Sequence, residues 1–199
     1  MARPPAITRY GRVIEAAIAR FTAECFKDVE TPPLGELIAV EDGPETIVAV
    51  VSSIVTQGID PSRRVNAHGG PEDDLPTVLA AHPHVPALLL TTFSGSVVGY
   101  LAPDGVRQYL PPAPPPIQAR VRACSDEEVR EFTGSFDFLR LLLETGPLAD
   151  EVLAAALRRA AEAYGAAGRA FLVRAGKALS PLLARDPVRL QATLRRMQA

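Results

Sequence analysis

Short runs of apolar residues, separated by Pro and Gly, dominate the first part of the chain. The clearest lie at 13–18, 37–40 and 47–55, within a stretch that begins at Tyr10, and Val and Ile are frequent in them. Runs of this length, rich in β-branched residues and bounded by turn residues, predict strands. The run that begins at Ile47 is apolar nearly throughout, so we expect it to be buried on both faces or to lie within a closed barrel.

A long polar segment at 57–84 interrupts this pattern. It is rich in Gly, Pro and charged residues, and a connection of this length is unusual within a compact domain. We expect a loop here, with a short helix at 75–81. After it, apolar runs at 87–93 and 96–101 flank Ser94-Gly95, a pattern typical of a β-hairpin.

The sequence YLPPAPPPI at 109–117 contains five prolines and favours an extended conformation without internal hydrogen bonds. It is either a stiff connector or a ligand for a proline-recognising domain. It leads into an expected strand at 117–123, where Arg120 and Arg122 alternate with apolar residues. We expect the face that carries these two arginines to be solvated.

From Ser125 onwards the apolar spacing becomes helical. Ser125 and Glu128 form an S-x-x-E capping box, which satisfies free amides at a helix start. The apolar residues that follow lie three and four positions apart, on one helical face: Val129, Phe132, Phe136, Leu139 and Leu143. Gly146-Pro147 ends this helix, and further helices are expected at 148–164, at 169–184 and after Asp186-Pro187.

These patterns predict an α+β protein. An N-terminal closed β-barrel of about six strands is expected at 9–124, with the long loop at 57–84, and three to four helices rich in Arg, Ala and Leu at 125–199. The charge changes at a similar place. Residues 1–145 hold 12 Lys and Arg against 19 Asp and Glu, a net charge of −7, whereas residues 146–199 hold 9 against 4, a net charge of +5.

Length, charge and cysteine content limit the function classes. The chain has 199 residues, is 47% hydrophobic and has a net charge of −2, so it can bury a core and is not uniformly basic. Its two cysteines, Cys25 and Cys124, lie far apart in no metal-like spacing. No secretory signal and no run of ~18–20 apolar residues are visible, so we expect a cytoplasmic protein without a membrane span.

Residues that could carry catalysis are few. His82-Pro83-His84 places two imidazoles on one side of an extended segment, and a metal ion would need further ligands, such as His68 or the acidic residues at 72–74. Ser96 is in the wrong position for a G-x-S-x-G nucleophile. Both cysteines are interpreted as small core residues. The sequence therefore favours a protein without catalytic residues, cofactor or metal.

The basic residues of the last third are the clearest indication of a binding surface. The candidates for contact with a protein partner or with nucleic acid are Arg158, Arg159, Arg189, Arg195 and Arg196. Clustered arginines are typical of proteins that contact phosphate groups. Aromatic residues for base stacking are scarce nearby, only Tyr164 and Phe171, so a solvated or partner-facing helical surface is the alternative.

Five segments in order resemble the HAS-barrel family. They are GRVI at 11–14, PLGELIAVE at 33–41, IVAVVSSIV at 47–55, VVGYL at 97–101 and YLPPAPPPIQARV at 109–121. The family's small β-barrel is shared by HerA-type DNA-translocating ATPases and the crown of ATP synthase subunits. The resemblance covers about residues 9–124. It implies a closed barrel that precedes an ATPase domain and helps to organise a hexameric ring, with one wall against the neighbouring subunit.

The chain departs from this family after the barrel, where a P-loop is expected. The only Gly-Lys pair is Gly176-Lys177; the motif's first Gly would fall on Phe171, and its Ser or Thr on Ala178. Three hypotheses follow. The chain is an assembly module that binds itself or a HerA-like ring ATPase; it is a nucleic-acid-associated accessory factor that uses its basic helices; or it is an enzyme with a site in the 57–84 loop.

Overall fold

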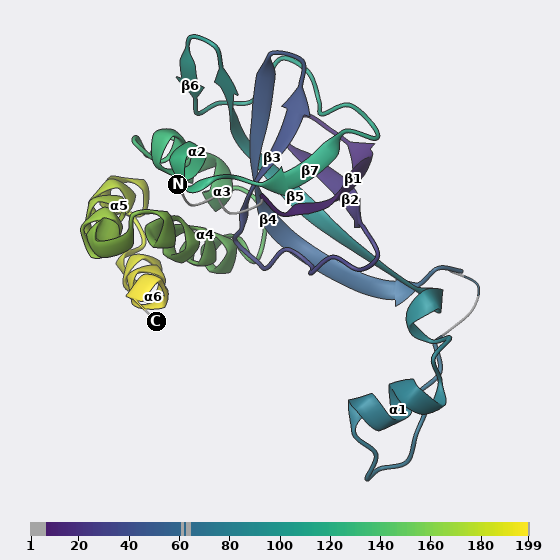
Figure 1. Cartoon of the computed structure of the whole chain (residues 1–199). Coiled ribbons are helices and arrows are strands. Elements are labelled where there is room, and N and C mark those ends of the chain that lie inside the picture. The colour runs from purple at the N-terminus through teal and green to yellow at the C-terminus, as the bar shows by residue number, and fades with distance from the viewer. Residues whose placement is uncertain (1–6, 61, 63–64, 199) are drawn as a thin grey trace.

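The computed structural model describes residues 7–60, 62 and 65–198 and shows a β-barrel with helices packed against one side (Figure 1). The strands are β1 (Arg9–Ala16), β2 (Arg20–Cys25), β3 (Leu37–Asp42), β4 (Glu45–Gly58), β5 (Leu89–Ala102), β6 (Gly105–Arg107) and β7 (Arg120–Ala123). The helices are α1 (Leu75–Ala81), α2 (Asp126–Phe132), α3 (Leu139–Leu143), α4 (Ala149–Ala163), α5 (Gly168–Leu182) and α6 (Pro187–Gln198), with 3₁₀ turns η1 (Pro86–Leu88) and η2 (Gly165–Ala167).

Six antiparallel strands close the barrel. Their order is β2-β1-β7-β3-β4-β5, and a further pairing between β2 and β5 joins the two ends. The short β6 pairs with β5 and lies outside the closed set. Closure leaves no free sheet edge around the barrel itself. The predicted α+β class, with a closed barrel of about six strands followed by helices, is confirmed.

The expected hairpin at Ser94-Gly95 is wrong, because β5 runs straight through these residues. Gly95 pairs with Phe21 of β2 on one side and with Val51 of β4 on the other. A Cβ atom on Gly95 would lie 2.6 Å from Cζ of Phe21. The glycine therefore permits the aromatic ring to pack across the strand, and it does not mark a turn.

The barrel interior and its outer wall are both apolar, and β4 contributes to each. Ile47, Ala49 and Val51 belong to the cluster inside the barrel, whereas Val48 and Val50 belong to a second cluster shared with the helices. Successive side chains of a strand alternate between its faces. The prediction of burial on both faces is confirmed for this part of β4.

The helical region shares its core with the outer wall of the barrel. Leu153 and Leu157 of α4 are fully buried in the cluster that contains Val50 of β4 and Val98 of β5. Helix α4 occupies the centre of the region, with α5 and α6 on its far side (Figure 1). The helices are therefore docked on the barrel.

The first expected helix forms as two helices, α2 and α3. The capping box at its start is confirmed, since Ser125 accepts from the Glu128 amide and Glu128 accepts from the Ser125 amide. The break follows Phe132. There the Gln108 side chain donates to the Phe132 and Ser135 carbonyls and accepts from the Phe138 amide. These bonds replace those of a continuous helix at a position where a nearby glycine already weakens helical structure.

Strands β4 and β5 continue outwards as an arm, the described residues of 54–91 (Figure 1), which is two-stranded from Thr56 and Thr91 onwards, because β2 still pairs with β5 at Phe93 and Thr92, opposite Ile54 and Val55. Its far end carries η1 and α1, which confirms the short helix expected at Leu75–Ala81. Pairing between β4 and β3 ends at Val50, so the outer part of β4 leaves the barrel. The expectation that all of this strand is buried is wrong from Ser53 to Gln57, where the side chains are exposed.

Candidate interaction site

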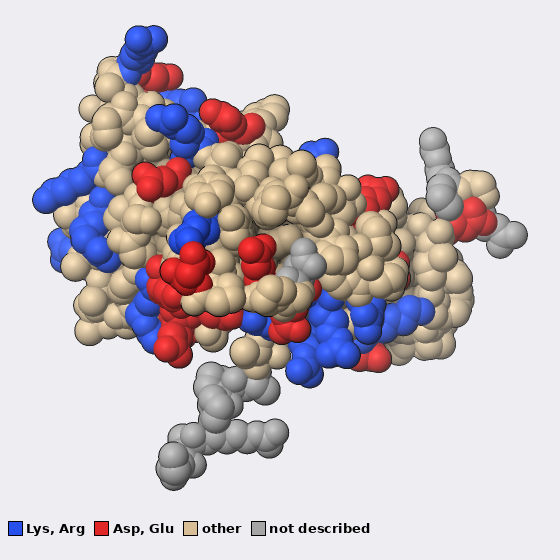
Figure 2. Space-filling view, turned by 90° about the horizontal axis from the view of Figure 1, so that it is seen from above, with Lys and Arg blue, Asp and Glu red and all other residues tan. Residues whose placement is uncertain are grey.

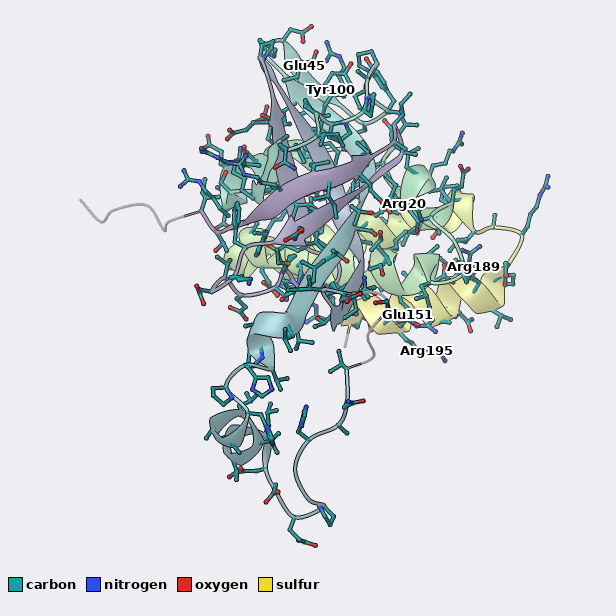
Figure 3. The ribbon with its side chains drawn as sticks, turned by 90° about the vertical axis from the view of Figure 1, so that its right-hand side faces the viewer. Arg20, Glu45, Tyr100, Glu151, Arg189 and Arg195 are labelled. Carbon is teal, nitrogen blue, oxygen red and sulfur yellow. The ribbon has the colours of Figure 1, made fainter. Side chains whose placement is uncertain are left out.

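Four of the five candidate arginines hold parts of the fold together. Arg189 pairs with Asp150 at 2.7 Å, and Arg196 pairs with Glu151 at 2.6 Å, so both fasten α6 to α4. The Arg158 guanidinium donates to the Arg196 carbonyl in the same region. Figure 3 shows Glu151 and Arg189 on the helical side of the molecule.

Arg159 fastens α4 to the barrel. Its guanidinium lies 3.1 Å from the Glu36 carboxylate, just before β3. Burial raises the pKa of Glu36, and the Arg159 charge opposes that rise. Burial, together with the Glu36 charge, also raises the pKa of Tyr10 to about 12. This ion pair therefore belongs to the junction between barrel and helices.

Arg195 differs from the other four, because its side chain forms neither an ion pair nor a hydrogen bond with any residue that the structure describes. The five arginines therefore do not form one surface of available charges. On the face seen in Figure 2, basic and acidic side chains occur in small adjoining groups rather than as one basic surface. Phosphate binding at several points needs cations that are not already paired. The geometry gives four of the five arginines, all but Arg195, a structural role.

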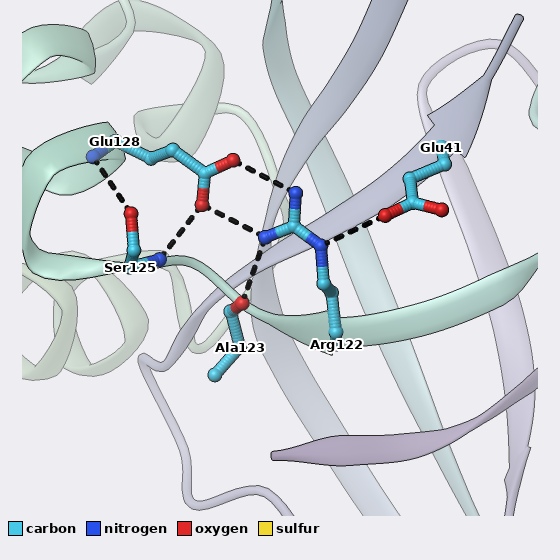
Figure 4. A network of polar contacts seen from close by, with 5 residues as sticks. All are labelled: Glu41, Arg122, Ala123, Ser125 and Glu128. Atoms are coloured by element: carbon cyan, nitrogen blue, oxygen red, sulfur yellow. Dashed lines mark hydrogen bonds and ion pairs between the residues drawn. The ribbon is translucent and has the colours of Figure 1, made fainter. Parts of the chain in front are cut away.

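Arg122, expected on a solvated face, is instead the centre of a polar network (Figure 4). Its side chain is 14% exposed. It pairs through both terminal nitrogens with Glu128 at 2.8 Å, and through Nε with Glu41 at 3.2 Å. The Glu128 carboxylate also accepts from the Ser125 amide. The capping box of α2 is thus joined to β7 and β3.

The titration behaviour of this network follows from its geometry. Burial alone would raise the pKa of Glu128, but the hydrogen bonds from Arg122 and Ser125 hold that pKa below its usual value. The pairing with Glu128 also raises the pKa of Arg122. Both groups therefore remain charged at neutral pH, and they stabilise the junction between β7 and α2.

The structure brings the three histidines of the chain together in the arm. The ring centroids of His68 and His82 are 4.3 Å apart, and those of His82 and His84 are 5.9 Å apart. Two nearby carboxylates are used locally, since Asp73 accepts from the Gly70 amide and Asp74 caps α1. Within the described residues, no group of three or more His, Cys, Asp or Glu side chains is placed to hold a metal ion.

The candidate nucleophiles lie in structural positions. Ser96 is buried in β5, and its hydroxyl donates to Ser52 of β4. Burial raises the pKa of the Cys124 thiol, and it also raises that of Cys25. A raised thiol pKa lowers the thiolate fraction at neutral pH and so lowers reactivity. Gly176-Lys177 lies inside α5, as expected from its helical context.

The arm carries the clearest unused surface of the described chain. Ile54 and Val55 are 38% and 46% exposed, although both lie in a regular β-ladder. Ile59 and Leu88 are also exposed, and so is Leu75 of α1. Beyond Val51, β4 pairs with β5 and with no other described strand, so one edge of the arm has unpaired backbone groups.

Sequence reasoning did not identify this surface. The run that begins at Ile47 includes Ile54 and Val55, and their residue type does not distinguish them from the buried aliphatic residues at 47–51. Two features could have indicated the surface. The strand is long, since β4 has 14 residues, and the serines at 52 and 53 lie where it leaves the barrel. Strands of this length exceed what a small barrel usually needs.

Comparisons with known proteins add no assignment, since no protein-family model and no curated protein matches the chain. The described part of the chain has no helix long and apolar enough to cross a membrane.

Proposed function

We propose that the protein is a non-enzymatic assembly module whose arm binds another protein. The observation that carries this proposal is the combination, in one element, of exposed aliphatic side chains and an unpaired strand edge. From Thr56 and Thr91 outwards the arm is a two-stranded ribbon, which is marginally stable in water when nothing covers it. Exposed apolar surface of this kind is typical of protein-interaction sites.

The mode of binding that suits the arm is addition of a strand to the outer edge of β4. The backbone groups of this edge, around Ile54 and Val55, would supply the hydrogen bonds. The exposed side chains of these residues would supply specificity, as in other cases of β-augmentation.

A HerA-like ring ATPase is the partner that the sequence favours, with other copies of the chain as the alternative. The ring ATPase is supported by the resemblance of residues 9–124 to the HAS-barrel family, whose members contribute barrels to ring assemblies. A closed six-stranded barrel agrees with that resemblance. The absence of a P-loop motif from the sequence is consistent with a role beside a motor rather than as one.

The test is affinity capture from the native organism, with nuclease treatment and identification by mass spectrometry. We expect a nuclease-resistant ring ATPase with the wild-type chain and its loss with Ile54→Ser/Val55→Ser. Ile18→Ser is the matched control, since Ile18 is an exposed aliphatic residue at the turn between β1 and β2. Capture of no ring ATPase, or capture that persists in the arm variant, would contradict the proposal.

A further inference from the structure

The tip of the arm is acidic and has no core of its own. Residues 65–88 contain Glu72, Asp73 and Asp74 and no Lys or Arg. Helix α1 buries none of its residues, and Leu75 at its start is 69% exposed. The hydrogen bonds from Thr77 lower the pKa of Asp74, so its charge persists at neutral pH. The tip therefore presents an aliphatic side chain next to three carboxylates.

The groove between α5 and α6 has the complementary character. Its volume is about 580 Å³, and its lining includes the apolar residues Leu172, Val173 and Leu194 together with Arg169 and Lys177. Neither of these two cations forms an ion pair with a described residue. Both are thus available to an acidic ligand, beside an apolar surface.

Within one chain the tip and the groove do not meet, because the arm leaves the barrel on the side away from α5 and α6 (Figure 1). Each copy nevertheless carries both halves of a complementary contact. We infer that the arm tip of one copy docks in the α5–α6 groove of another copy, with Glu72, Asp73 and Asp74 facing Arg169 and Lys177 and with Leu75 on the apolar lining. This inference rests on the proposed assembly function and names a second copy as the partner of the tip.

A contact between two different surfaces of identical chains limits the kinds of assembly that can form. Such contacts are either exchanged reciprocally within a dimer or repeated from copy to copy, in which case they close into a ring if the rotation permits. Opposite charges on the two surfaces make the association depend on salt, and like charges at either surface oppose it.

The experiment is size-exclusion chromatography with light scattering on the purified full-length chain, from low to high salt. The arm variant is Glu72→Gln/Asp73→Asn/Asp74→Asn/Leu75→Ser, in which Asn at position 74 can still cap α1. The groove variant is Arg169→Glu/Lys177→Glu. We expect the wild type to self-associate, and we expect the dissociation constant of each variant to be at least about tenfold higher. Glu127→Gln/Glu131→Gln, on the exposed side of α2, is the control that should behave as wild type.

Mixing the two variants gives the decisive result. Each variant retains one intact half, so the mixture should form a 1:1 complex that joins the intact arm of the groove variant to the intact groove of the arm variant. A wild type that is monomeric at high concentration, or variants that associate as well as wild type, would overturn the inference. In that event, loss of the ring ATPase on mutation of Ile54 and Val55 would still support the proposed function, so the two proposals fail separately.

Discussion

The body of the molecule and its arm share strand β4, whose β-branched residues lie in different surroundings in the two regions. In the barrel, Val48 and Val50 of β4 are fully buried against the helices, whereas Val55, further along the same strand, is nearly half exposed. The fold of the chain itself explains the apolar residues of the body. It does not explain those of the arm, and this difference is the reason to assign the arm to a partner.

Truncation of a core residue of the body has the largest expected effect. Leu153 is fully buried between the outer wall of the barrel and the other helices. Leu153→Ala should lower the free energy of unfolding by about 2–5 kcal/mol, measured by urea denaturation. Leu148→Ala, at an exposed position before α4, should change it by less than about 0.5 kcal/mol. Equal effects of the two would show that the helices are not docked as described.

Removal of Arg122 has the next largest expected effect. Arg122→Met leaves Glu128, which is 22% exposed, without its paired donor. We expect a loss of about 1–3 kcal/mol in the free energy of unfolding, because charged hydrogen bonds in a half-buried network are broken. Arg120→Met, at an exposed position of the same strand, is the matched control and should have little effect. An unchanged free energy of unfolding in Arg122→Met would show that the network does not stabilise the fold.

The same network predicts a pH dependence. The pKa of Glu128 is lower in the folded than in the unfolded chain. Its contribution to stability is therefore present above the unfolded pKa of about 4.3 and is lost as the pH falls through the folded pKa. Acid titration of stability should show a smaller loss in Glu128→Gln than in wild type. An unchanged acid profile would contradict a lowered pKa for this group.

The elements specified by nearby residues were predictable from the sequence, and those specified by distant ones were not. The Ser125–Glu128 capping box and the apolar spacing after it identify the start of α2 within one turn. Gly95 gives the opposite case, because its role depends on Phe21, which is distant in the sequence. Arg122 looks like any alternating charge until the fold places Glu128 and Glu41 beside it.

The candidate site follows the same rule. The five arginines were recognised as a group from sequence, but their acidic partners come from other elements, such as Glu36 before β3 and Asp150 in α4. Burial of an apolar residue such as Val55 depends on what surrounds it, and its place in a β-branched run predicts only that it lies in a strand. The exposed aliphatic surface of the arm is therefore evident from the structure and not from the sequence.

Changes in the arm should have a small effect on stability and a large effect on binding. Ile54→Ser/Val55→Ser removes side chains that are already partly in water, so we expect the free energy of unfolding to change by less than about 1 kcal/mol. Thermal unfolding followed by circular dichroism checks this, in parallel with the capture experiment. A loss as large as that of Leu153→Ala would mean that the arm packs within its own chain, and the contrast between arm and body would fail.

The smallest expected effect concerns the basic helices, and it separates the assembly function from nucleic-acid binding. Arg195→Ala should leave stability unchanged, whereas Arg189→Ala and Arg196→Ala each lose one partly exposed ion pair and about 0.2–1 kcal/mol. Fluorescence anisotropy with labelled duplex DNA, across a range of salt, should show no strong binding by wild type and no change in the triple variant Arg189→Ala/Arg195→Ala/Arg196→Ala. Binding that weakens with salt and falls in the triple variant would instead assign these arginines to phosphate contacts, because counterion release requires cations that reach the DNA backbone. The ion pairs to Asp150 and Glu151 would then have to open on binding, at a free-energy cost that the DNA contacts must exceed.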